Sequence, residues 1–279
     1  MSPQARPDFS DPFVPAKLTD VAVGLPMAVS RDWAWGGGTG RGVRVAVIDS
    51  GVDSAHPAIN GRVSAYCAVT MDGATPVFDL SPHGDVYGHG TACAGIVLSL
   101  APEAEIVSVR VLGEDLKGTG AAFAAGVRWS IDQGIAVGNL SLGTTRREFY
   151  ALFHELADAA WFADIALVTA ANNLPTPSFP SMFPSVISVA SHDEQDPMRF
   201  YVNPRPPVDF GARGVNVRVP WKDGGWATMT GNSFAAPHVT GLVALIRGKH
   251  PDLTPLQIKA LLQALATNAR MPAVAGGSR

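Results

Sequence analysis

Short apolar runs alternate with longer segments of helical periodicity along most of the chain. The runs with the length and β-branched content of strands buried on both faces are Val43–Ile48, Glu105–Val111, Ile135–Leu142, Ile165–Ala170 and Val186–Ala190. Gly120–Gln133 and Arg147–Phe162 are typical of helices, Asp209–Ala227 of short strands and turns, and Thr254-Pro255 of a helix start. This alternation predicts an α/β fold, a single three-layer domain with helices on both faces of a mostly parallel central sheet.

A long apolar helix is predicted near the end of the chain. The stretch Gly231–Val239 leads into the apolar run Thr240–Ile246, so the helix begins at or just before Ser233, with Pro237 expected in its first turn. A hydroxyl at a helix N-terminus faces free backbone N–H groups, which favour a developing negative charge. Taken alone, this serine is best interpreted as an N-cap.

The composition argues against several classes of protein. The 279 residues carry a formal net charge of −3, which gives no basic surface for nucleic acid or an anionic membrane. The sequence contains no uninterrupted run of about eighteen apolar residues, so no membrane span is expected. Residues 1–20 lack the apolar core of a signal peptide, so export is not indicated. Cys67 and Cys93 make no disulfide framework, so a reduced, cytoplasmic location is expected. We expect residues 1–20 to form a flexible N-terminal extension.

Two further residues stand where such a sheet keeps its chemistry. Asp49 follows the apolar strand Val43–Ile48, at the carboxyl end where open α/β sheets place their active sites. His89 lies among small residues at the start of a helical run, so a substrate can approach its ring closely. With Ser233 they form a candidate triad, because a serine nucleophile needs a base, and a buried aspartate orients that base and stabilises the imidazolium.

These three motifs resemble those of a subtilisin-like serine protease (subtilase). Residues 47–53 (VIDSGVD) resemble the family's aspartate motif, residues 88–95 (GHGTACAG) its histidine motif and residues 231–239 (GNSFAAPHV) its serine motif. The similarity runs from about Val21 to Ala266 and implies a peptidase domain over residues 21–279. It also implies a serine endopeptidase in which Ser233 attacks the peptide bond, His89 is the general base and Asp49 orients His89.

The resemblance further implies an oxyanion-binding asparagine. The family's Ala-Ala-Gly-Asn segment matches residues 170–173, which assigns this role to Asn173. Asn172 replaces the family's glycine, and the register between Asn172 and Asn173 stays open at this point. Asn232 stands where the family usually has threonine, a change expected to affect rate more than reaction type. Cys93 matches the cysteine of proteinase K-like members and implies sensitivity to thiol reagents, although a small buried apolar residue is the simpler role.

Substrate binding follows from the same resemblance. Subtilases bind an extended peptide or protein substrate along strand edges, so backbone hydrogen bonds supply affinity and side-chain pockets supply selectivity. The residues implied in substrate binding are Gly118, Thr119, Gly120, Leu140, Ser141, Leu142, Gly143, Ala170 and Ala171. The pocket for the residue before the cut is implied to lie between residues 142–144, 170–172 and 179–180, none of which is acidic, and this argues against specificity for basic residues. The nearby Arg146 and Arg147 could favour an acidic side chain, although solvated arginines are the commoner case.

No cofactor and no metal is expected. Many secreted subtilases bind calcium through a loop that bulges from the histidine-motif helix and a carboxylate soon after the aspartate motif. Here Ile96–Pro102 offers no loop of oxygen ligands, and Ala58 stands at the carboxylate position. A weaker cation site near Asp193 or Asp209 is the alternative.

Three functions are compatible with these motifs. The first is an intracellular endopeptidase. The second is a processing protease or acyl-transferring macrocyclase that acts on one dedicated precursor peptide. The third is an inactive peptide-binding relative, which the intact set of Asp49, His89 and Ser233 disfavours. Residues 1–20 are either an inhibitory segment or a disordered tail.

Overall fold

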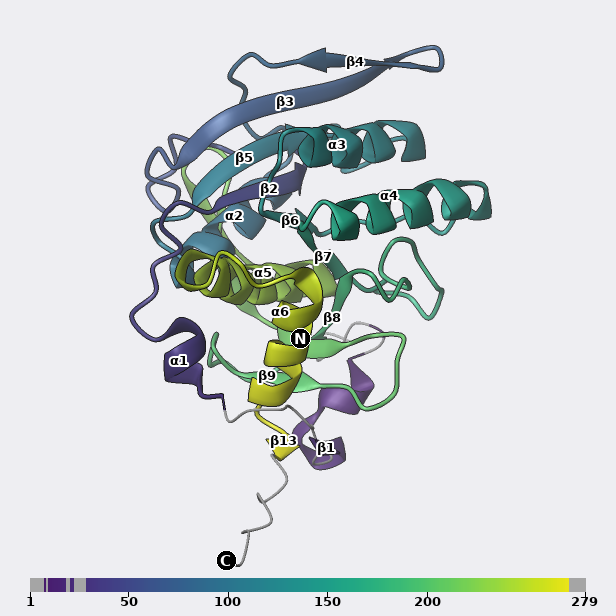
Figure 1. The fold of residues 1–279 in the computed structure, drawn as a ribbon. Coiled ribbons are helices and arrows are strands. Elements are labelled where there is room, and N and C mark those ends of the chain that lie inside the picture. The colour runs from purple at the N-terminus through teal and green to yellow at the C-terminus, as the bar shows by residue number, and fades with distance from the viewer. Residues whose placement is uncertain (1–7, 9, 19–20, 23–28, 271–279) are drawn as a thin grey trace, which may run out of the picture.

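The computed structural model describes residues 8, 10–18, 21–22 and 29–270 (Figure 1). The helices are α1 (Arg31–Trp35), α2 (His89–Leu100), α3 (Gly120–Asp132), α4 (Tyr150–Phe162), α5 (Asn232–Lys249) and α6 (Pro255–Leu265). The short 3₁₀ helices are η1 (Asp11–Phe13), η2 (Pro15–Lys17) and η3 (Arg147–Phe149). The strands are β1 (Val21–Ala22), β2 (Arg44–Asp49), β3 (Val63–Asp72), β4 (Thr75–Asp79), β5 (Glu105–Arg110), β6 (Val137–Leu140), β7 (Ala166–Ala170), β8 (Ile187–His192), β9 (Phe200–Val202), β10 (Phe210–Arg213), β11 (Val217–Trp221), β12 (Gly225–Met229) and β13 (Ala269–Arg270).

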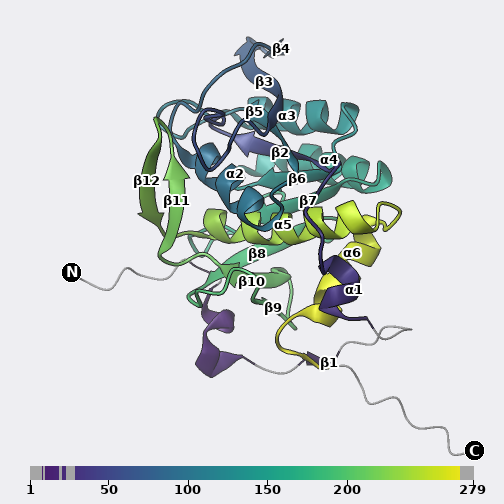
Figure 2. The ribbon, with the colours of Figure 1, turned by 90° about the vertical axis from the view of Figure 1, so that its left-hand side faces the viewer.

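One sheet dominates the described part of the chain. Its nine strands lie in the order β4-β3-β5-β2-β6-β7-β8-β10-β9. All neighbours from β3 to β10 are parallel, and β4 and β9 are antiparallel edge strands. Helices α3 and α4 cover one face, and α2, α5 and α6 cover the other (Figures 1 and 2). The predicted three-layer α/β domain with a mostly parallel sheet is therefore confirmed.

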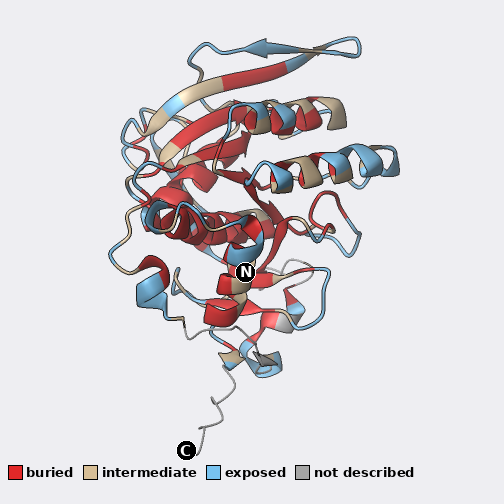
Figure 3. Ribbon diagram, viewed as in Figure 1, coloured by how far each residue is buried: buried red, intermediate tan, exposed pale blue. Residues whose placement is uncertain are grey.

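Strand β2 shows why the sheet is buried on both faces. Val45 and Val47 pack into the core beneath α2 and α5, whereas Ala46 and Ile48 pack into the core beneath α3 and α4. All four side chains are fully buried, and Figure 3 shows the central strands buried along their length. Successive side chains of a strand point to opposite faces, so a strand covered on both sides must be apolar at every position.

The β3–β4 hairpin was not predicted from the sequence. Strand β4 lies at the sheet edge, and most of its residues are exposed. An edge strand that faces water needs no apolar run, so the pattern that identified the central strands is absent there.

None of the helices in the described part of the chain has the length and hydropathy needed to span a bilayer.

The N-terminal segment, by which we mean residues 8 and 10–18, packs against the domain. The sequence led us to expect a flexible extension here. Phe13 in η1 is 1% exposed and lies in a small apolar cluster with Ala171, Tyr201 and Val208. Burial of this ring stabilises the packing of the segment against the domain. The proline-rich composition of the segment does not reveal this contact. The boundary at residue 20 stays a prediction, and residues 1–7, 9 and 19–20 lie outside the described residues.

Candidate active site

Asp49 is held at the carboxyl end of an interior strand. It is the last residue of β2, and its side chain is fully buried. Its carbonyl accepts hydrogen bonds from the backbone N–H groups of Val111 (2.8 Å) and Leu112 (3.2 Å), which fix the strand end. Gly90 lets α2 approach, because a Cβ there would lie 2.0 Å from the Gly51 carbonyl oxygen. The strand end and the start of α2 are thus forced together.

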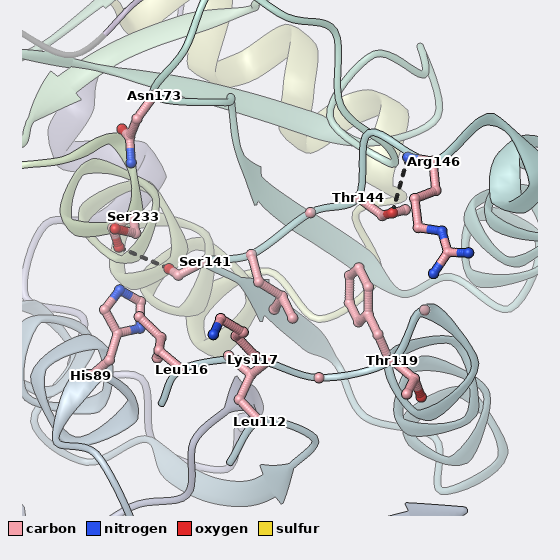
Figure 4. Close-up of a pocket in the computed structure, with 15 residues that line it drawn as sticks. His89, Leu112, Leu116, Lys117, Thr119, Ser141, Thr144, Arg146, Asn173 and Ser233 are labelled. Atoms are coloured by element: carbon pink, nitrogen blue, oxygen red, sulfur yellow. Dashed lines mark hydrogen bonds between the residues drawn. The ribbon is translucent and has the colours of Figure 1, made fainter. Parts of the chain in front are cut away.

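His89, the first residue of α2, pairs directly with Asp49. Its Nδ1 lies 2.9 and 2.8 Å from the two carboxylate oxygens of Asp49. Since a carboxylate only accepts, Nδ1–H donates, and Nε2 of the neutral ring is left as a base. Burial lowers the pKa of His89, but the negative charge of Asp49 outweighs this effect and holds the pKa well above its usual value. In Figure 4 the ring extends toward Ser233.

Asp85 caps the turn that presents His89, and the sequence analysis missed it. Its Oδ1 accepts from the Ser50 hydroxyl (2.8 Å) and from the N–H groups of Tyr87 (2.9 Å) and Gly88 (2.7 Å). Its Oδ2 accepts from the N–H and hydroxyl of Thr91 at 2.8 and 2.7 Å. An aspartate a few residues before a helical run is a helix-capping signal, which could have identified it.

Ser233 lies in the first turn of α5, as its second residue. Pro237 falls in the second turn, one turn later than we expected. Because proline has no N–H, the carbonyl of Ser233 loses its helical donor. That carbonyl instead accepts from the Ser141 hydroxyl at 2.8 Å. The irregularity therefore ties the turn that carries Ser233 to the chain after β6 (Figure 4). Among the described residues, no hydrogen bond joins the Ser233 hydroxyl to His89.

The two asparagines after β7 have different partners. The Oδ1 of Asn173 accepts from the backbone N–H of Asn232 at 2.8 Å, and its amide nitrogen points toward Ser233 (Figure 4). The amide of Asn172 is used locally: it donates to the Thr176 carbonyl and accepts from the Leu174 N–H. This arrangement favours Asn173 over Asn172 as the oxyanion donor.

We expect Asn173→Ala to lower kcat by about 10²–10³-fold with little change in KM, because an amide in the role of oxyanion donor acts only in the transition state. The matched variant Asn172→Ala removes an amide that is engaged in its own loop, so its kcat should stay near that of the wild type. Steady-state kinetics on one peptide substrate measure both. The opposite ranking would place the oxyanion donor at residue 172.

A pocket of about 430 Å³ joins these groups to most of the predicted substrate-binding residues (Figure 4). His89, Asn173 and Ser233 line it. The substrate-binding candidates that line it are Gly118, Thr119, Gly120, Ser141, Leu142 and Gly143. Ala170 and Ala171 line an adjoining pocket of about 450 Å³ that shares Ser141–Thr144, Arg146, Asn173 and Ser233. Leu140 is different: its side chain is fully buried in the core beneath α3 and α4, and it lines neither pocket.

Cys93 lies beneath the His89–Asp49 pair. Its Sγ is 3.9 Å from His89 Nδ1, 4.0 Å from Asp49 Oδ2 and 3.6 Å from the Ser233 carbonyl oxygen. The side chain is fully buried, and burial raises the pKa of the thiol. Cys93 is thus a neutral thiol that fills space behind the catalytic ring.

Removing calcium is expected to leave the melting temperature unchanged. Helix α2 runs without interruption from His89 to Leu100, so no loop bulges from it to supply ligands. Of the alternative cation ligands, Asp209 is engaged by Lys259 at 2.9 Å and by the Ser188 hydroxyl at 3.0 Å. The test is a thermal melt of the inhibited protein with and without chelator. A large fall, restored by calcium, would show that a calcium site stabilises the native state.

The chain is similar in sequence to proteins of one family over most of its length. The family model described as "Subtilase family" matches residues 40–277. Subtilisin BL from Lederbergia lenta is 32% identical over 262 residues, 88% of this chain and 93% of that protein. Thermitase from Thermoactinomyces vulgaris is 32% identical over 233 residues, 79% of this chain and 80% of that protein. Among solved structures, the S41 psychrophilic protease matches with a TM-score of 0.70 and 27% identity, covering 81% of this chain and 83% of that one.

Proposed function

Because this chain belongs to the subtilase family of serine proteases, we propose that it hydrolyses peptide bonds through an acyl-enzyme on Ser233. The observation that carries the assignment is the buried pair of His89 and Asp49, with Nδ1 at 2.8 Å from the carboxylate and the ring extended toward Ser233. Such a pair leaves one ring nitrogen free to take the serine proton.

The proposed steps conserve protons. His89 Nε2 takes the proton of the Ser233 hydroxyl as Oγ attacks the peptide carbonyl carbon. The oxyanion that forms accepts hydrogen bonds from the Asn173 amide and the Ser233 backbone N–H. His89 then gives its proton to the leaving amine, and the C–N bond breaks. A water molecule, deprotonated by His89, attacks the acyl carbon, and the proton returns to Ser233 as the acid leaves.

We propose that neutral or acidic side chains are preferred near the cut. Among the described residues, those that line the two pockets include Lys117 and Arg146 but no aspartate or glutamate. Both cations already have partners, since Lys117 lies 3.1 Å from Asp115 and Arg146 lies 2.6 Å from Glu148. Exposed pairs of this kind are weak and can exchange partners, so the preference for acidic residues is expected to be modest.

The test is a hexapeptide library analysed by mass spectrometry. An endopeptidase of open specificity gives many cleavage products, each pair adding up to the substrate plus one water. A dedicated processing enzyme cleaves very few sequences. A macrocyclase gives a cyclic product that carries no new carboxylate, and the masses of its products add up to that of the substrate without an added water. An inactive peptide-binding relative gives no product. Cleavage mainly beside lysine or arginine would contradict the proposed specificity.

We also propose that the protein works in a reducing compartment. Cys67 and Cys93 are both buried free thiols, and burial raises the pKa of Cys67 to about 12. Such thiols contribute as packed side chains and need no oxidant to mature. Cell fractionation tests the location, and recovery from an extracellular fraction would contradict it.

A further inference from the structure

The N-terminal segment contacts the loop that carries the proposed oxyanion donor. The backbone N–H of Asp8 donates to the carbonyl of Asn173 at 3.0 Å. The carbonyl of Asp8 accepts from the side-chain amide of Asn232 at 2.9 Å. A single residue of this segment, Asp8, therefore joins the loop after β7 to the start of α5. Residues 173–177 are all exposed, so the loop has few other constraints on its outer side.

Asn232 is the residue through which these contacts are coupled. Its side chain is fully buried, and its Oδ1 accepts from the N–H and hydroxyl of Ser191 at 2.8 and 2.9 Å. Its Nδ2 donates to the carbonyls of Asp8, Ala171 and Asn172 at 2.9–3.2 Å. Its backbone N–H holds Asn173 Oδ1 at 2.8 Å. The same residue thus grips the N-terminal segment and sets the direction of the Asn173 amide.

Phe13 anchors the segment a few residues further on. Its ring occupies the space beside Gly211 in β10, where a Cβ would lie 2.3 Å from the ring. Ala171, in the loop that leads to Asn173, belongs to the same apolar cluster. The buried Phe13 ring therefore packs against the loop after β7, close to the contacts that Asp8 makes with the same loop.

We propose that the N-terminal segment, acting through Asn232, is a positioning element for Asn173. In this segment, Asp8 binds the backbone carbonyl of Asn173 on the exposed side of the loop after β7. The buried Asn232 binds the side-chain Oδ1 of Asn173. The inference rests on the proposed role of Asn173 as oxyanion donor. A catalytic donor must be held within about 0.5 Å of its productive position. Release of the segment therefore lowers the rate of the chemical step without changing substrate binding.

The test is Phe13→Ala, alone and combined with Asn173→Ala. We expect Phe13→Ala to lower kcat by about ten-fold, with KM within about two-fold, because the displaced amide acts only in the transition state. In the Asn173→Ala background the same substitution should cause no further loss, since two changes that act through one group are not additive. Concentrations are normalised by stoichiometric fluorophosphonate labelling, so a poorly folded fraction does not count as lost kcat.

Three further variants keep the test specific. Gly211→Ala should lower kcat in the same way, because its methyl group would displace the Phe13 ring. Phe13→Leu retains an apolar anchor and should restore most of kcat. Phe162→Ala is the matched control, because Phe162 is 84% exposed at the end of α4 and its loss should change nothing.

The outcomes separate this inference from the proposed function. If Asn173→Ala leaves kcat intact, the oxyanion assignment fails and the inference fails with it. If Asn173→Ala lowers kcat but Phe13→Ala does not, only the inference is overturned. An equal loss from Phe13→Ala in both backgrounds also overturns it, because the segment would then act on the domain without acting through Asn173.

Discussion

Ser233→Ala is expected to lower kcat by about 10⁶-fold and to abolish covalent labelling by fluorophosphonates. Without Oγ, His89 has no hydroxyl to deprotonate, and its pairing with Asp49 contributes nothing to acyl transfer. The oxyanion donors remain, so a residual acceleration of about 10³-fold over the uncatalysed reaction should persist. Among the described contacts none involves the Ser233 Oγ, so the melting temperature should be unchanged.

The matched control for this substitution is Ser99→Ala. Ser99 lies on α2, its hydroxyl bonds to the Ile96 carbonyl, and it lines neither pocket next to Ser233. Turnover and labelling of this variant should match the wild type. Burst kinetics with an activated ester measure the first step directly. Turnover of Ser233→Ala within ten-fold of the wild type would show that another group is the nucleophile.

The sequence was most informative where burial and chemistry leave a local pattern. The apolar runs that predicted central strands correspond to β2, β5, β6, β7 and β8, because these strands are covered on both faces. Asp49 and His89 were predicted to meet, and the structure places them in direct contact. The role of oxyanion donor was assigned to Asn173 by aligning residues 170–173 with a four-residue family motif. The contacts of the Asn173 amide favour this alignment over one that places the donor at Asn172.

The residues that the sequence did not reveal act through partners far away along the chain. Asn232 could be recognised as a departure from the family's threonine, but its bonds to Asp8 and Ser191 depend on how three segments meet. Phe13 stands in a proline-rich stretch that composition alone assigns to an extension, and its burial depends on the space beside Gly211. Such contacts are set by tertiary packing, for which local patterns give no signal.

Asp49→Asn is expected to lower kcat by about 10⁴-fold while leaving the shape of the site almost unchanged. The asparagine amide donates to His89 Nδ1, which places the ring proton on Nε2, so the ring faces Ser233 with a donor where a base is needed. The neutral amide also cannot stabilise the imidazolium that forms during proton transfer. Steady-state kinetics with active-site titration measure the loss.

The same substitution should move the acidic limb of the pH profile. His89 acts as a base only when neutral, and its pKa is raised well above its usual value of 6.5, so kcat/KM of the wild type should fall as the pH drops through a value above 6.5. In Asp49→Asn the charge that raises the pKa is gone and burial lowers it, so the residual activity should persist to lower pH. The matched control is Asp158→Asn. Asp158 is partly exposed on α4, pairs with His154 and lines neither pocket next to His89, so this change should leave the pH profile unchanged. An acidic limb at the same pH in the wild type and Asp49→Asn would mean that the Asp49 charge does not set the protonation of the base.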